Sequence, residues 1–214
     1  KGAAERQKIE PTRPLEKGVE IDVEMDVSKA YLVIAALAPD YNHADQHAMD
    51  ILTEILGRGV NPMLYSALMN PRRLIQTVSM AYHSLQYGGI VLIYLTLDPK
   101  NLGSVKREAL SFLRKARDQN FSPDDVYGEL QMYAYDYLRF AKNQIKYNAY
   151  QSQEKGLALA VSIARFMLVS EGSTPRNYLK SIDEVKSGDL RKAAAKYFSR
   201  SPYVLISIVP KKTN

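Results

Sequence analysis

The segment from Tyr31 to Asp98 constrains the fold more than any other part of this 214-residue chain. Its apolar spacing and its β-branched and aromatic runs predict a fixed order of elements. These are a strand over Tyr31–Ala38, a helix from Ala44 to Leu56, a glycine break at Gly57-Arg58-Gly59, a short helix over Pro62–Met69, and strands over Gln76–Leu85 and Ile90–Leu97. The segment carries no usable catalytic set, which indicates a non-catalytic half of a larger protein.

Composition excludes several classes of protein. No window approaches the roughly 18 uninterrupted apolar residues that a membrane span requires. The absence of cysteine excludes disulfides, thiolate zinc sites and cysteine nucleophiles. The net charge of +6 comes from basic residues interleaved with acidic ones, which favours a solvated surface over nucleic-acid binding. A basic face that attracts an acidic partner stays open, and so does the compartment: a soluble chain of this kind fits a bacterial periplasm or cytoplasm.

One domain boundary follows from the N-terminal pattern. Residues 1–18 are polar, contain Pro11 and Pro14, and predict a linker or N-terminal arm. Apolar and acidic residues then alternate strictly over Val19–Val27, which predicts a half-buried strand with an acidic outer face. We therefore expect one folded domain over residues 19–214.

The second half is predicted to be helical and to end in a strand. The expected elements are a helix over Asn101–Asn120, a long helix capped by Ser122 and running to Tyr150, a break at Gln151-Ser152, a further helix to Val169, a last helix capped by Ser187, and a strand over Tyr203–Val209. Strands at both ends of the domain with helices between them predict an α+β fold in which a sheet packs against a helical layer.

The two histidines at His43 and His47 mimic an inverted zinc motif. In that motif two histidines bind zinc and a glutamate activates the bound water. Here Gln46 stands in the place of the glutamate, and an amide cannot take the proton. The only other histidine is His83. We expect both residues of the motif to face solvent and no zinc to bind.

Two further features have structural interpretations. Gly57 and Gly59 follow a helix and so predict a left-handed C-cap rather than a phosphate cradle. The tyrosine-rich segment places apolar and aromatic residues at helical spacing, which predicts core packing with hydroxyls near the surface. A binding wall for an extended peptide is the alternative. The stripe consists of Leu130, Tyr133, Tyr137, Phe140 and Ala141.

Several short motifs occur in a particular order along the chain. Residues 31–39 read Tyr-Leu-Val-Ile-Ala-Ala-Leu-Ala-Pro and residues 50–59 read Asp-Ile-Leu-Thr-Glu-Ile-Leu-Gly-Arg-Gly. They are followed by Leu64-Tyr65-Ser66-Ala67-Leu68, Ala141-Lys142-Asn143-Gln144-Ile145, Tyr197-Phe198 and Val209-Pro210. Over Val19–Pro210 the chain thus resembles the second, inactive domain of the pitrilysin/insulinase/mitochondrial processing peptidase family of zinc metallopeptidases.

The resemblance implies a processing-peptidase-like fold that forms part of a chamber closing over a substrate. In the catalytic domain of that family the zinc motif lies on the first long helix. The corresponding turn here is Asp50–Glu54, which lacks both histidines and the glutamate base. No catalytic or metal residue and no cofactor is therefore expected in this chain. Zinc is expected in a catalytic partner domain or subunit that bears His-x-x-Glu-His.

The resemblance also suggests where substrate would touch. Many C-terminal halves of the family carry an arginine and a tyrosine seven residues apart; the register places Met69 and Gln76 there, so that pair is missing. The segment after the short helix lines the chamber in the family, and here it offers Arg72, Arg73 and Gln76. Two adjacent arginines can give forked hydrogen bonds to a peptide carboxylate or carbonyl. A solvated basic turn is the alternative interpretation.

These observations favour a non-catalytic module of a zinc metallopeptidase that closes the proteolytic chamber and contributes to binding unfolded peptides. A structural or assembly subunit of the same fold, with no role in proteolysis, is the alternative. An independent binding protein that uses its basic surface is a third. A homodimer or a heterodimer is compatible with each of them.

Overall fold

The computed structural model describes residues 14–69, 72–126, 131, 134–169 and 175–211. Five strands form one mixed sheet in the order β1-β5-β2-β4-β3. Strand β1 runs parallel to β5, and the other neighbouring strands are antiparallel. The strands are β1 (Val19–Met25), β2 (Ala30–Ala38), β3 (Thr77–Leu85), β4 (Gly88–Leu97) and β5 (Val204–Pro210).

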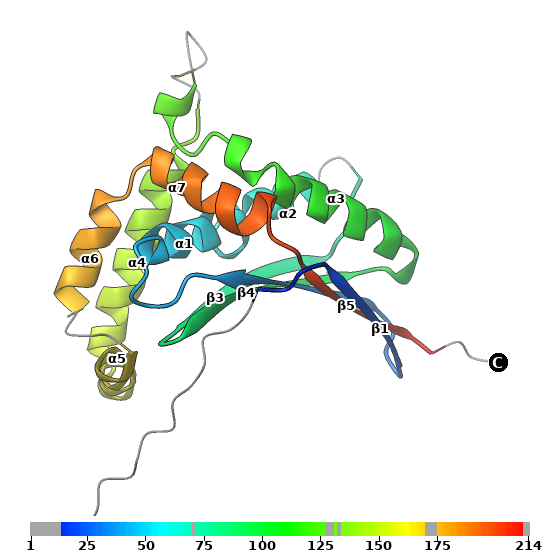
Figure 1. Ribbon diagram of the computed structural model, residues 1–214, viewed down its shortest axis with the longest axis horizontal. Coiled ribbons are helices and arrows are strands. Elements are labelled where there is room, and N and C mark those ends of the chain that lie inside the picture. Colours follow the sequence, from blue (N-terminus) through cyan, green and yellow to red (C-terminus); the bar gives the residue numbers. More distant parts are fainter. Residues whose placement is uncertain (1–13, 70–71, 127–130, 132–133, 170–174, 212–214) are drawn as a thin grey trace, which may run out of the picture.

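The helices gather on one side of this sheet (Figure 1). Two of them end in a π-helical turn, namely α1 at Glu54–Arg58 and α7 at Ala195–Ser199. The α-helices are α1 (Gln46–Thr53), α2 (Met63–Met69), α3 (Leu102–Arg114), α4 (Tyr137–Glu154), α5 (Gly156–Val169), α6 (Pro175–Glu184) and α7 (Ser187–Ala194). The α+β fold with a sheet packed against a helical layer is confirmed.

The core lies between the sheet and the helices. Alternate residues of β2 and β4 point toward the helical layer, and Leu32, Ile34 and Ile93 are fully buried there. They meet apolar residues of α1, such as Met49 and Leu52, in a single cluster. The opposite face of the sheet carries no helix among the described residues (Figure 1).

The first strand differs from its prediction. Strand β1 begins at Val19, but all seven of its residues are exposed, so the expected half-buried strand is wrong. The acidic side faces the helices, since Lys106 of α3 contacts Glu20 at 3.3 Å and Asp22 at 3.1 Å. The apolar side chains therefore lie on the open face of the sheet. The division into an arm and a domain at residue 19 stays a prediction, because residues 1–13 lie outside the described part.

The long helix begins later than the sequence predicts. Ser122 and Asp125 do form a capping box, but it starts only a 3₁₀ turn over Pro123–Asp125. Helix α4 begins at Tyr137, and the Asp136 carboxylate accepts a hydrogen bond from the Arg139 N–H at 3.0 Å. The cap was predicted correctly and the helix that follows it was not, because a capping box specifies a first turn and not its continuation. The break before α5 falls at Lys155.

The predicted aromatic stripe is only partly in the core. Ala141 is buried, whereas Phe140 is half exposed and stacks on Tyr135 with ring centroids 4.9 Å apart. Leu130 and Tyr133 lie outside the described residues.

No helix formed by the described residues has the length and apolar character needed to cross a membrane.

The glycine break serves close packing and not a left-handed cap. Gly57 lies inside the π-helical turn, and Gly59 is extended with φ −64° and ψ −176°. A Cβ on residue 57 would lie 2.4 Å from the Cβ of Met80 on β3. The glycine therefore lets the end of α1 approach the sheet.

Replacing Gly57 by alanine should destabilise the fold by about 1–3 kcal/mol, because the added methyl group overlaps Met80 and the helix must move away from β3. Chemical denaturation would measure the loss. Gly103→Ala is the matched control, since a Cβ there meets nothing within 4 Å and the residue lies in helix α3. Equal stability of the Gly57→Ala and Gly103→Ala variants would contradict this account of the break.

Candidate functional site

The three residues predicted to touch substrate lie on one exposed turn after α2. Arg73 has a left-handed backbone, with φ 50°. Its N–H donates to the Met69 carbonyl at 2.8 Å, and the Leu74 N–H donates to the Leu68 carbonyl at 3.1 Å. The turn thus closes the C-terminus of α2 and holds its arginines outward.

The neighbours of this turn restrict what it can offer. The Arg72 guanidinium forms an ion pair with Glu108 of α3, with Nη1 and Oε1 2.9 Å apart. The Gln76 N–H donates to the Thr96 carbonyl at 2.7 Å and so continues the pairing of β3 with β4. Arg72, Arg73 and Gln76 are all exposed. The structure brings them together, and their contact with a substrate stays a prediction.

The turn in register with a zinc motif has structural partners instead of metal ligands. Asp50 accepts hydrogen bonds from the Gln46 amide at 2.6 Å and the Tyr178 hydroxyl at 2.9 Å. Glu54 is buried and pairs with Arg58, with Oε1 and Nε 3.3 Å apart. Burial raises the pKa of Glu54, and the Arg58 charge opposes that rise only in part.

The two motif histidines are held by different helices. Against expectation both are partly buried. The ring of His47 lies against Tyr178 with centroids 5.4 Å apart, and burial lowers the pKa of His47. The His43 ring meets Tyr197 edge to face at 6.5 Å. No group of three or more histidines, aspartates and glutamates suited to a metal occurs in the described ranges. These residues do not fit the zinc ion that the resemblance implies for the catalytic domain.

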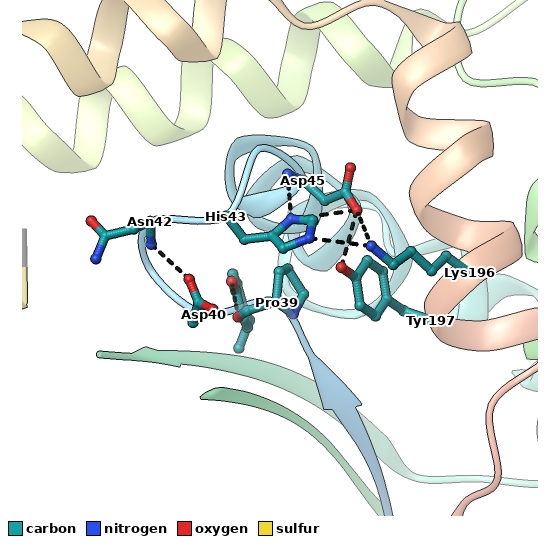
Figure 2. Close-up of polar contacts among 8 residues, drawn as sticks. Pro39, Asp40, Asn42, His43, Asp45, Lys196 and Tyr197 are labelled. Carbon is teal, nitrogen blue, oxygen red and sulfur yellow. Dashed lines mark hydrogen bonds and ion pairs between the residues drawn. The ribbon is translucent and has the colours of Figure 1, made fainter. Parts of the chain in front are cut away.

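A polar network joins the start of α1 to the end of α7 (Figure 2). The Asp45 carboxylate accepts hydrogen bonds from the Lys196 ammonium at 2.9 Å and the Tyr197 hydroxyl at 3.0 Å. His43 Nδ1 accepts the Asp45 N–H at 2.9 Å. A neutral imidazole that accepts at Nδ1 carries its proton on Nε2. The contact between Nε2 and Lys196, at 3.2 Å, is therefore not a hydrogen bond to the ring, and Asp45 is the acceptor of the ammonium.

An apolar cleft of about 400 Å³ adjoins this network at one end of the open sheet face. Its lining is almost free of charge, with the Lys196 side chain as the one cation among the residues that line it. The lining includes Leu15, Ala35, Leu37, Ile90, Tyr197 and Val204. The cleft can accept an apolar side chain of an extended segment.

Sequence reasoning missed this cleft although a signal was present. The run over Tyr31–Ala38 is apolar at nearly every position, so both faces of that strand are apolar. Such runs are typical of strands covered on both faces. Only the helix end that brings Lys196 to the rim of the cleft required the structure.

The chain is similar to known proteins in sequence and in fold. A family model described as the peptidase M16 inactive domain matches residues 2–133, which is more than half of the chain. No curated protein matches. A protease from Helicobacter pylori has a TM-score of 0.76 and 20% identity over 97% of this chain and 49% of its own.

Two further solved structures have the same fold. The peptidase M16 inactive domain from Pseudomonas fluorescens has a TM-score of 0.73 and 19% identity over 100% of this chain and 48% of its own. A chain of Complex III2 from Candida albicans has a TM-score of 0.71 and 17% identity over 89% of this chain and 45% of its own. The chain spans about half the length of each of these three. The family match confirms the resemblance drawn from the sequence.

The Asp45 network gives a pH-dependent contribution to stability. Burial raises the pKa of Asp45, but the hydrogen bonds from Lys196 and Tyr197 outweigh it, so the pKa lies below its usual value. Because the folded-state pKa is below the unfolded one, the stabilisation is present above about pH 4 and is lost as the pH falls through the folded pKa.

Asp45→Asn should therefore destabilise the protein by about 1 kcal/mol at pH 7, and the difference from wild type should shrink below about pH 4. Urea denaturation between pH 7 and pH 2 would measure both effects. Asp118→Asn, at an exposed carboxylate that pairs with its sequence neighbour Arg117, serves as control. A difference that is constant with pH would show that Asp45 acts through packing and not through its charge.

Proposed function

Because the chain belongs to the M16 peptidase family and matches the model of its inactive domain, we propose that it closes the proteolytic chamber of a zinc metallopeptidase. In this role it docks on a catalytic domain or subunit that bears His-x-x-Glu-His and contributes a wall for unfolded peptide. The zinc ion and the hydrolytic chemistry belong to that partner.

One observation carries the proposal. The turn in register with the zinc motif holds Asp50 and Glu54, whose carboxylates are taken up by Tyr178, Gln46 and Arg58. A zinc site that hydrolyses peptides needs three protein ligands and an open position for water. A domain that has this fold but lacks these ligands contributes to the structure around the active site and not to the hydrolysis itself.

Two surfaces support a role in holding peptide. The apolar cleft can accept an apolar side chain, because Lys196 is the one charged residue among the described residues that line it. The turn after α2 exposes Arg72 and Arg73, whose guanidinium groups can pair with a peptide carboxylate or carbonyl. Neither surface requires a particular peptide sequence, which suits the binding of unfolded chains.

A structural subunit without a role in proteolysis is the second candidate. The observation that favours it is the similarity to a chain of Complex III2 from Candida albicans. Such a subunit would need neither the arginine turn nor the cleft for its function. Substrate kinetics therefore separate the two candidates.

Adding this chain to its catalytic partner should raise hydrolysis of an unfolded peptide by at least about tenfold, because a closed chamber orients the peptide and excludes water. The assay compares the catalytic domain alone, the mixture, and the catalytic domain with an unrelated protein of equal concentration. A catalytic domain that already works at the full rate by itself would exclude the chamber-closing role.

Replacing Arg72 and Arg73 together by alanine should raise the Michaelis constant of the assembled enzyme about two- to fivefold and leave kcat and the melting temperature nearly unchanged, since exposed ion pairs are worth little to the fold. The matched control is the double alanine variant of the exposed residues Arg107 and Arg117, which removes the same charge. An unchanged Michaelis constant would return the turn to the solvated surface, and a large loss of melting temperature would make it structural.

A further inference from the structure

A small pocket of about 60 Å³ lies in the helical layer, between the end of α1 and the start of α4. The π-helical turn that ends α1 contributes Glu54 to its wall. Helix α4 contributes Tyr137, Ala141 and Gln144, which follow one another at the spacing of a single helical face. Because Ala141 in the middle of this face has a small side chain, space remains between the two helices.

Glu54 is a buried carboxylate whose charge is only partly compensated. Its side chain is 5% exposed, and its Oε1 lies 3.3 Å from Nε of Arg58. Within the described part of the chain, neither carboxylate oxygen accepts a hydrogen bond. A Cβ at residue 59 would lie 3.9 Å from Oε2, so this second oxygen lies toward Gly59, which also lines the pocket. Burying a carboxylate oxygen without a partner is costly, and burial accordingly raises the pKa of Glu54.

Two further acceptors lie on the α4 side of the pocket. The Gln144 amide nitrogen donates to Asn148 at 3.0 Å, which leaves the amide oxygen of Gln144 without a partner among the described residues. The Tyr137 hydroxyl also makes no hydrogen bond within the described ranges, and burial raises its pKa, so it stays neutral. The pocket thus offers one carboxylate oxygen and two neutral acceptors.

This set of acceptors selects among cations. A primary ammonium group carries three N–H donors, one for each acceptor, whereas a guanidinium would bring five. Divalent metals prefer several carboxylate or histidine ligands. Glu54 is the one such residue among the described residues that line the pocket.

The rim of the pocket is apolar and open to solvent. Val60 is 92% exposed, and the stacked rings of Tyr135 and Phe140 are exposed as well. A lysine side chain or an alkylamine has the complementary structure, an apolar stem of methylene groups that ends in an ammonium group. A water needs about 10–15 Å³ of such volume, so the pocket has room for roughly four waters or for an ammonium group with its last methylenes.

We propose that this pocket binds a primary ammonium group on a short alkyl stem. The ammonium donates to Oε2 of Glu54, to the amide oxygen of Gln144 and to the hydroxyl oxygen of Tyr137. The stem lies against Val60 and Phe140 at the rim. A lysine side chain of a polypeptide and a free alkylamine both present this group. The binding requires neither a catalytic partner nor proteolysis, so it can be tested on this chain alone.

n-Butylammonium chloride, titrated into the full chain at pH 7 and constant ionic strength, should shift the NMR signal of the Gly59 amide until it saturates. This N–H is a suitable probe because it donates to the Glu54 carbonyl at 2.8 Å beside the pocket. n-Butanol and sodium butyrate have a similar stem with a neutral or a negative end and should cause no saturable shift. Potassium chloride should cause none either, and a shift equal to that of the amine would overturn the proposal.

A second titration separates the two sources of the ammonium group. It uses the peptide glycyl-lysyl-glycine, acetylated at its N-terminus and amidated at its C-terminus, so that the lysine carries the one charge. Tighter binding of the peptide than of n-butylammonium identifies a polypeptide lysine as the ligand, and the reverse order identifies a free amine. Failure of both to bind would overturn the proposal.

Glu54→Gln keeps the shape of the side chain and removes its charge, so it should weaken n-butylammonium binding at least about tenfold. Gln144→Leu removes a neutral acceptor and should weaken binding by a smaller factor, about three- to tenfold. Glu24→Gln is the matched control, because it removes the same charge from an exposed position on β1 and should bind as wild type does.

Circular dichroism checks that each variant is folded. If Glu54→Gln does not fold, Gln144→Leu and the comparison of n-butylammonium with n-butanol still decide. Equal binding of the amine by wild type and by a folded Glu54→Gln variant would overturn the proposal, and so would equal binding of n-butanol and n-butylammonium.

Discussion

Alternate side chains of the central strands point into the helical layer, where Leu32 of β2 and Ile93 of β4 are fully buried. The layer reaches these strands because the end of α1 lies directly on Met80, which only a residue without a side chain at position 57 permits. This contact fixes the position of Glu54 and Arg58 and, through α1, the network around Asp45. It also determines which face of the sheet is buried and which is left open.

The network at Asp45 stabilises helix α1, which corresponds to the helix that carries the zinc ligands in a catalytic domain. Residues far apart in the sequence, Asp45 and Lys196, tie the start of α1 to the end of α7. Farther along α1, Tyr178 of α6 bonds Asp50. Carboxylates that would be costly to bury without partners are each satisfied by the chain itself.

How much the sequence could predict is clearest from individual elements. The spacing of the apolar residues predicted the order of strands and helices. The cap at Ser122 was found where it was expected. The extent of α4 was not predictable, because Ser122 specifies one turn only. The role of Gly57 was misassigned because its neighbour Met80 lies on β3, a contact between segments that no local pattern contains. The arginine turn was located from its order in the chain, but its ion pair with Glu108 depends on tertiary packing.

The alternation in β1 is the most instructive case. The acidic residues are exposed as expected, and Asp22 also contacts Lys106 of α3, but the apolar residues were assigned to the core and Ile21 instead lies exposed on the open face. An alternating strand shows that its two sides differ, but not which side the rest of the chain covers. When the acidic side has its cation within the chain, the apolar side has to find its cover elsewhere.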